Sequence, residues 1–97
     1  MDKKLAEIFV KRKLIKLDTE VEVEHQVQEF GGSTFDKLDF YNVTKVDGTH
    51  FKGTSTVDGE ELDFDYEQIV TIDGMSPKRL SQAFGIKYYE ILWKIFV

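Results

Sequence analysis

The clearest pattern in this chain is an alternation of apolar and polar residues between positions 15 and 28. One parity carries mostly apolar or β-branched side chains: Ile15, Leu17, Thr19, Val21, Val23, His25 and Val27. The other parity carries charged or amide side chains: Lys16, Asp18, Glu20, Glu22, Glu24, Gln26 and Gln28. A period of two with one apolar face is typical of a β-strand that packs against a core. An unbroken strand over 14–29 would span about 50 Å, so we expect a strong bend or a turn near Asp18-Thr19.

Turn signals divide the next part of the chain into further short strands. Asp47-Gly48 and Asp58-Gly59 each lie between two alternating runs. Asp-Gly is a strong hairpin signal because glycine readily adopts a positive φ. The pattern predicts a meander of short antiparallel strands over residues 35–46, 51–57, 62–66 and 69–72.

The residues before the first strand predict a short helix over 2–13. Asp2 can accept hydrogen bonds from the first free N–H groups of this helix. The predicted inner face has helical spacing and consists of Leu5, Ile8 and Phe9, with Arg12 at its end. The basic residues 11–13 would lie near the C-terminus of the helix, where its dipole favours cations.

A second short helix is predicted near residues 76–84. Ser76 can cap it, and Pro77 suits the first helical position, where a missing N–H costs nothing. Gly85 would end the helix, whose predicted inner face consists of Leu80, Ala83 and Phe84. Residues 86–97 then alternate as in a final strand, although the spacing of their apolar residues also fits a helix.

These elements predict one mainly β domain of the α+β class over residues 1–97. The expected architecture is a strongly bent antiparallel sheet or a small barrel, with the two short helices beside it. Apolar residues make up 41% and aromatic residues 13% of the chain, enough for one modest core. We expect no signal peptide, because Glu7 interrupts the first apolar run, and no membrane-spanning segment.

Several function classes are excluded by what the chain lacks. It has no Cys, which excludes disulfides, thiolate metal sites and thiol nucleophiles and fits a cytoplasmic protein. Two His are too few for a His-built metal site, and no phosphate-binding, dinucleotide-binding or zinc-protease motif occurs. We expect His25 to be a hydrogen-bonded histidine of the core or its edge, with pH sensing as the alternative. The chain is therefore expected to be no enzyme and to have no catalytic residue, cofactor or metal.

Charge is segregated along the chain. Residues 1–17 contain six Lys or Arg and two acids, a net charge of +4, and residues 18–73 contain three Lys and fifteen acids, a net charge of −12. The last segment, 74–97, carries +3, and the whole chain carries −5. Glu20, Glu22 and Glu24 share one face of the first strand, which makes them a candidate site for a basic protein partner. The alternative is a solvated face that prevents edge pairing.

Three further functions stay open from the sequence, and the first is an enzyme or small-ligand protein, because a bent sheet can hold a pocket. A nucleic-acid-binding protein would use basic residues of the terminal segments: Lys3, Lys4, Lys11, Arg12, Lys13, Lys78 and Arg79. A homo-oligomer would pair the edge of the first long strand, or the segment around Trp93, with a second copy. The function that the sequence favours is a non-enzymatic cytoplasmic binding or regulatory module that acts through protein contacts.

Two segments carry a family resemblance. The stretch Leu38-Asp39-Phe40-Tyr41-Asn42-Val43 resembles the acidic–aromatic–Asn part of the first Sm motif, and 66–72 is similar to the last strand of bacterial Sm-like RNA chaperones. The resemblance implies an SH3-like or Sm-like small barrel over residues 2–74. It does not imply the family's RNA site, because Glu67 and Gln68 stand where the family has a Lys-His pair. The net charge of the middle segment also opposes phosphate binding.

Overall fold

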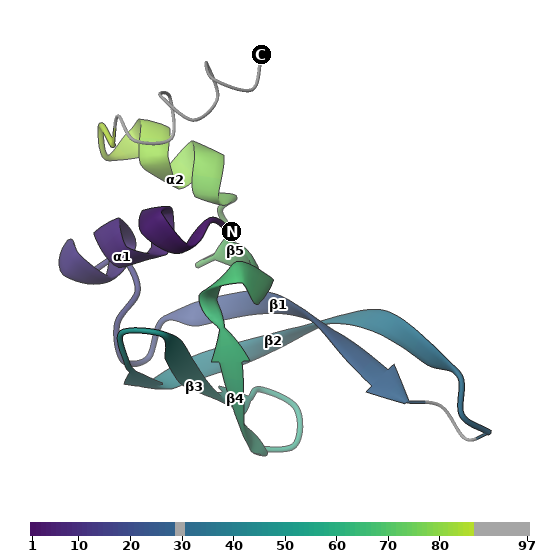
Figure 1. Ribbon diagram of the computed structural model, residues 1–97. Coiled ribbons are helices and arrows are strands. Elements are labelled where there is room, and N and C mark those ends of the chain that lie inside the picture. Colours follow the sequence, from purple (N-terminus) through teal and green to yellow (C-terminus); the bar gives the residue numbers. More distant parts are fainter. Residues whose placement is uncertain (29–30, 87–97) are drawn as a thin grey trace, which may run out of the picture.

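The structure is a computed structural model that describes residues 1–28 and 31–86 (Figure 1). Within these residues five strands form one antiparallel sheet in the order β4-β3-β2-β1-β5. The elements are α1 (Lys3–Lys11), β1 (Glu20–Gln28), β2 (Thr34–Val46), β3 (His50–Ser55), β4 (Glu61–Asp65), the 3-10 helix η1 (Tyr66–Gln68), β5 (Ile69–Ile72) and α2 (Pro77–Ala83). The predicted mainly β fold with two short helices is confirmed. The described sheet is open, because its edge strands β4 and β5 do not pair with each other.

Helix α1 begins as the sequence predicts. The side chain of Asp2 accepts hydrogen bonds from the N–H groups of Lys4 at 2.9 Å and Leu5 at 3.2 Å. Leu5, Ala6 and Phe9 are the buried residues of the helix. Arg12, predicted at the end of the inner face, is exposed instead, since the helix ends at Lys11.

A turn separates α1 from β1, and it corrects one part of the predicted alternation. Asp18 has a left-handed backbone with φ 70°, so the strand begins only at Glu20. The hydroxyl of Thr19 accepts a hydrogen bond from the N–H of Lys16 at 3.0 Å, which closes the turn. Leu17, predicted on the apolar face, is 58% exposed because the turn breaks the parity, whereas Ile15 remains buried.

The pairing of β1 with β2 decides which face of the sheet is covered. Val21 lies opposite Tyr41, and Val23 lies opposite Asp39. Val21, Val23, Tyr41 and Val43 are all buried on one face, which we call the inner face. The first half of β1 also pairs with β5, so among the described residues only the part of β1 beyond Val23 leaves one edge without a pairing strand.

The far part of the β1–β2 hairpin extends beyond the rest of the sheet (Figure 1). β5 pairs with β1 only as far as Val23, and β3 pairs with β2 only from Tyr41 onward. Residues 24–28 and 34–39 therefore form a ribbon of two strands. The helices α1 and α2 lie together at the opposite end of the molecule.

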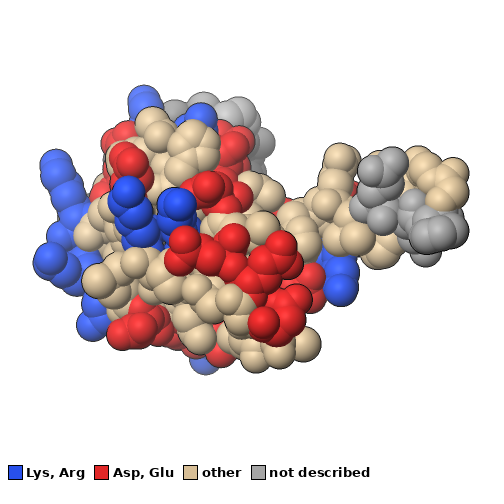
Figure 2. All heavy atoms as spheres, turned by 90° about the horizontal axis from the view of Figure 1, so that it is seen from below, with Lys and Arg blue, Asp and Glu red and all other residues tan. Residues whose placement is uncertain are grey.

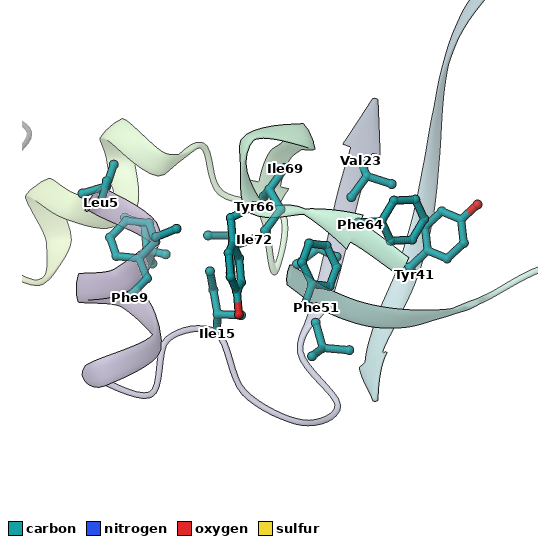
Figure 3. Close-up of a cluster of buried hydrophobic side chains, with 14 of the residues drawn as sticks. Leu5, Phe9, Ile15, Val23, Tyr41, Phe51, Phe64, Tyr66, Ile69 and Ile72 are labelled. Carbon is teal, nitrogen blue, oxygen red and sulfur yellow. The ribbon is translucent and has the colours of Figure 1, made fainter. Parts of the chain in front are cut away.

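Aromatic rings connect the sheet to the helices (Figure 3). The ring of Phe51 on β3 packs between those of Phe64 on β4 and Tyr66 on η1, with centroid distances of 5.5 and 5.4 Å. Leu5 and Phe9 of α1 cover one end of this cluster, and the inner face of the hairpin covers the other. One continuous core thus joins α1 to all five strands in the described part of the chain.

Two predicted strand ends differ from the observed ones. Val57 is 90% exposed because β3 ends at Ser55, whose hydroxyl oxygen accepts a hydrogen bond from the N–H of Val57 at 3.2 Å. Tyr66, predicted as a strand residue, begins η1 and is still buried. Its hydroxyl donates to the carbonyl oxygen of Asp47 and so ties η1 to the β2–β3 turn. Burial raises the pKa of Tyr66, which keeps this donor protonated.

Helix α2 begins as predicted but presents a different inner face. The side chain of Ser76 accepts a hydrogen bond from the N–H of Arg79 at 3.2 Å. Leu80 is buried as predicted, but Phe84 is 47% exposed because the helix ends one residue before it. Ala83 is also exposed, and Ser81 is buried in its place. The prediction for the final segment, 86–97, falls almost wholly on residues 87–97, which lie outside the described residues.

We predict that Gly53→Ala lowers the free energy of unfolding by about 1–3 kcal/mol, the usual cost of overpacking a core. A Cβ at Gly53 would lie 2.9 Å from the Cβ of Tyr41 on the neighbouring strand. Gly48→Ala is the matched control, since a Cβ there meets no atom within 4 Å. Urea unfolding measures both variants, and equal stabilities would contradict the packing of β3 against β2.

Candidate functional site

The face of the β1–β2 hairpin that points away from the core brings the predicted glutamates together with two large apolar side chains. Glu22 lies directly opposite Phe40, and Glu24 lies opposite Leu38. Leu38 is 51% exposed and Phe40 is 44% exposed. We call this surface the acidic-apolar face and define it by five residues: Glu20, Glu22, Glu24, Leu38 and Phe40.

The backbone explains why these apolar side chains are exposed. Successive side chains of a strand point to opposite faces, so burying Tyr41 and Val43 turns Phe40 outward. Leu38 has the same parity as Phe40 and lies farther out, where β2 pairs only with β1. A ribbon of two strands is marginally stable alone in water. Exposed apolar residues framed by charges are typical of surfaces that contact another molecule.

Within the described part of the chain, no cation neutralises the three glutamates. In residues 1–28 and 31–86, none of them forms an ion pair with Lys or Arg. The carboxylate of Glu22 accepts one hydrogen bond, from the hydroxyl of Thr71 on β5 at 3.3 Å. Equal charges at every second position of a strand repel one another, and a cation placed over this face would relieve that repulsion.

The apolar half of the face was missed by the sequence analysis, although a signal for it exists. β2 carries apolar residues on both parities, Leu38 and Phe40 on one and Tyr41 and Val43 on the other. An antiparallel sheet in a small domain commonly packs one face on the core and leaves the other in water, so one of these pairs is expected to be exposed. The sequence does not say which pair, because that depends on the register with β1.

The inner face of the same ribbon carries a histidine–carboxylate pair. The Nε2 atom of His25 lies 2.8 Å from a carboxylate oxygen of Asp39, and the Nζ atom of Lys37 lies 3.7 Å from the same oxygen. The edge of the His25 ring meets Tyr41, with a centroid distance of 6.0 Å. The prediction of a hydrogen-bonded histidine is confirmed.

The pKa of Tyr41 is raised, mainly by burial and then by the charge of Asp39, so the hydroxyl of Tyr41 stays neutral.

The basic residues predicted for nucleic acid fall into separate groups. Lys3 and Lys4 begin α1 and Lys11 ends it, which separates them by about 12 Å along the helix. The Nζ atom of Lys3 lies 3.7 Å from Glu67, and the guanidinium of Arg12 donates to the carbonyl oxygen of Phe84 at 3.1 Å. Lys13 follows α1, and Lys78 and Arg79 lie in the first turn of α2. They do not line one continuous strip along a single element.

A different basic surface is formed where the end of α1 meets the end of β2. Lys13, Lys16 and Lys45 surround a hollow of about 440 Å³ that is lined by apolar side chains. We call this surface the basic-apolar groove and define it by six residues: Val10, Lys13, Lys16, Leu17, Lys45 and Val46. Sequence reasoning missed it because residues 45 and 46 reach residues 10–17 only through the fold.

The acidic and basic surfaces lie toward different parts of the molecule. Seen from below the view of Figure 1, Lys and Arg gather mainly at the end away from the protruding hairpin (Figure 2). Asp and Glu cover the sheet between that end and the hairpin. Acidic side chains also lie among the basic ones in this view, so the separation of charge in space is partial.

Comparison of the chain with protein-family models, curated protein sequences and solved structures finds no match. Among the described residues, no group of three or more His, Asp or Glu is arranged to hold a metal ion. No helix in the described ranges combines the length and the apolar character needed to cross a bilayer. The surface chemistry of the chain itself is therefore the basis for a functional proposal.

We predict that Leu38→Thr and Phe40→Thr each lower the free energy of unfolding by about 1 kcal/mol, because half-exposed side chains contribute about half of a full burial. Tyr41→Thr, on the inner face of the same strand, should cost about 3–5 kcal/mol, since Tyr41 is 4% exposed. Urea unfolding of the three variants measures the difference. If the Leu38 and Phe40 variants lose as much free energy of unfolding as the Tyr41 variant does, the face of β2 that carries Leu38 and Phe40 packs on the core.

Proposed function

We propose that this chain is a non-enzymatic, cytoplasmic protein-binding module that docks its partner on the acidic-apolar face. The observation that carries the proposal is the pairing of Glu22 with Phe40 and of Glu24 with Leu38. This pairing places a row of charged side chains beside a row of apolar ones on the exposed side of the hairpin. A matching partner segment carries Lys or Arg interleaved with large apolar residues.

The two kinds of side chain have different parts in such binding. Burying the remaining exposed halves of Leu38 and Phe40 contributes about 1 kcal/mol each, and this contribution does not depend on salt. Ion pairs at an exposed face contribute about 0–1 kcal/mol each, but they attract a basic partner over several ångströms and disfavour an acidic one. The apolar pair therefore supplies most of the affinity, and the glutamates supply selectivity and speed of association.

The open edge of β2 suggests how a partner segment can dock. Residues 34–39 of β2 pair with β1 on one side, and within the described ranges no strand pairs with them on the other. An extended segment can add to this edge through backbone hydrogen bonds. Every second side chain of that segment would then lie on the acidic-apolar face, so the basic and apolar residues that contact this face must share one parity of the segment.

We further propose that the fold belongs with the SH3-like and Sm-like small barrels. This is supported by the order of elements, in which a short helix precedes a four-stranded meander and η1 leads to β5. It is also supported by the return of β5 to pair with β1. The acidic outer face favours a protein over a nucleic acid as the bound molecule, because phosphates are repelled by carboxylates.

Selection from a displayed library of random peptides tests the proposal. We expect the selected peptides to be rich in Lys or Arg and in large apolar residues. Replacing Glu20, Glu22 and Glu24 by Gln together should weaken one such peptide about tenfold at about 0.05 M salt, since three exposed pairs are lost. The difference should shrink at about 0.5 M salt, where charges are screened. Fluorescence anisotropy of the labelled peptide measures both effects.

The matched control removes the same amount of charge elsewhere. The variant with Glu7, Glu60 and Glu67 replaced by Gln has the same net charge, and these exposed residues lie on α1, the β3–β4 turn and η1. This control should bind the peptide as the unaltered chain does. If both triple variants bind the peptide equally weakly, only the overall charge matters. If both bind it as tightly as the unaltered chain does, the acidic-apolar face is not the docking site.

A further inference from the structure

We propose that the partner of the acidic-apolar face is a second copy of this chain, which offers its basic-apolar groove. This inference rests on the proposed function and names the partner of that same face. It is carried by the presence of two complementary surfaces on one molecule. Among residues 1–28 and 31–86, the charges of neither surface form an ion pair.

The basic-apolar groove has the features that the acidic-apolar face requires of a partner. Leu17 at its rim is 58% exposed, and Val10 and Val46 are half-buried in its lining. Its three lysines form no ion pair with any Asp or Glu in the described ranges. Other lysines do form such pairs, as Lys52 does with Glu61 and Asp63 on β4, each at 3.9 Å.

The charges and the apolar side chains match in kind on the two surfaces. Three lysines surround apolar side chains in the groove, and three glutamates adjoin Leu38 and Phe40 on the hairpin. The hollow of about 440 Å³ leaves room for apolar side chains to enter between the lysines. Apolar contact at the centre with opposite charges around it is the usual arrangement of a protein–protein interface.

Glu24 and Leu38, at the far end of the acidic-apolar face, cannot reach the basic-apolar groove of the same molecule, although Glu20 lies only three residues from Leu17 in the chain. β2 contributes Leu38 and Phe40 to one and Lys45 and Val46 to the other. Leu38 and Lys45 are seven residues apart on an extended strand, a distance of about 20 Å or more. The contact must therefore form between copies and joins two different patches, so it is head-to-tail. Such contacts continue into open chains or close into a ring.

Sedimentation velocity over a range of concentrations tests this inference. We expect the mean mass at about 0.05 M salt to rise with concentration to at least twice the monomer mass, and to be lower at the same concentration at about 0.5 M salt, where the charge pairs are screened. The variant E22K/E24K changes only the hairpin, and K16E/K45E changes only the groove. Each should be monomeric, because one of its surfaces then repels its counterpart.

Combining the two changes distinguishes this contact from any other. The fourfold variant E22K/E24K/K16E/K45E reverses the sign of both surfaces, from −3 to +1 on the hairpin and from +3 to −1 in the groove, so it should associate again, although more weakly than the unaltered chain. A mixture of the two double variants should associate as well. E22K/E24K supplies an unaltered groove, and K16E/K45E supplies an unaltered hairpin. The control E7K/E60K has the net charge of E22K/E24K but alters neither surface, and it should behave as the unaltered chain does. Circular dichroism verifies that every variant is folded.

The possible failures separate this inference from the proposed function. A chain that stays monomeric at millimolar concentration and low salt would overturn the second copy as partner. Peptide binding to the acidic-apolar face would then still stand. Association that persists in both double variants would also overturn the inference, because the contact would lie elsewhere, for example along a strand edge. The two double variants could also both be monomeric while the fourfold variant fails to associate again. That result would contradict the predicted charge pairing.

Discussion

The register between β1 and β2 is the constraint on which the rest of this structure depends. Val21 must face Tyr41 for both to be buried, and this choice turns Glu22 and Phe40 to the opposite side. A shift of one residue would put the glutamates into the core and the valines into water. Burying three unpaired carboxylates costs far more than any gain from covering Phe40 and Leu38, so only one register is compatible with a stable fold.

This constraint also produces the surface on which the function is argued. The core is complete where α1, η1 and the inner sides of β3 and β4 cover the first half of the hairpin. The second half extends past that core, so its apolar residues on the outer side have nothing in the described chain to cover them. The same β-strand thus links stability to recognition. Its buried parity holds the domain together, and its exposed parity combines apolar contact area with charge that selects a partner.

Local signals in the sequence were sufficient for the elements but not for the surfaces. The Asp-Gly turns, the cap of α1 and the parity of β1 depend on neighbouring residues, and all were predicted correctly. Leu17 was misplaced because the left-handed backbone of Asp18 interrupts the alternation. Phe84 was misplaced because α2 ends one residue earlier. The basic-apolar groove could not be found, because residues 10–17 meet Lys45 only after β2 has paired with β1.

Solution NMR tests the central claim, which is the register of the hairpin, most directly. Nuclear Overhauser contacts should connect the methyl groups of Val23 with the ring of Phe64 and with Ile69, and the methyl groups of Val21 with Tyr41 and Ile72. The methyl groups of Leu38 should show contacts to their neighbours on β1 and none to the rings of Phe51 and Phe64. Contacts from Leu38 or Phe40 to Phe51 or Phe64 would mean that the other face of β2 packs on the core, and the account of both surfaces would be wrong.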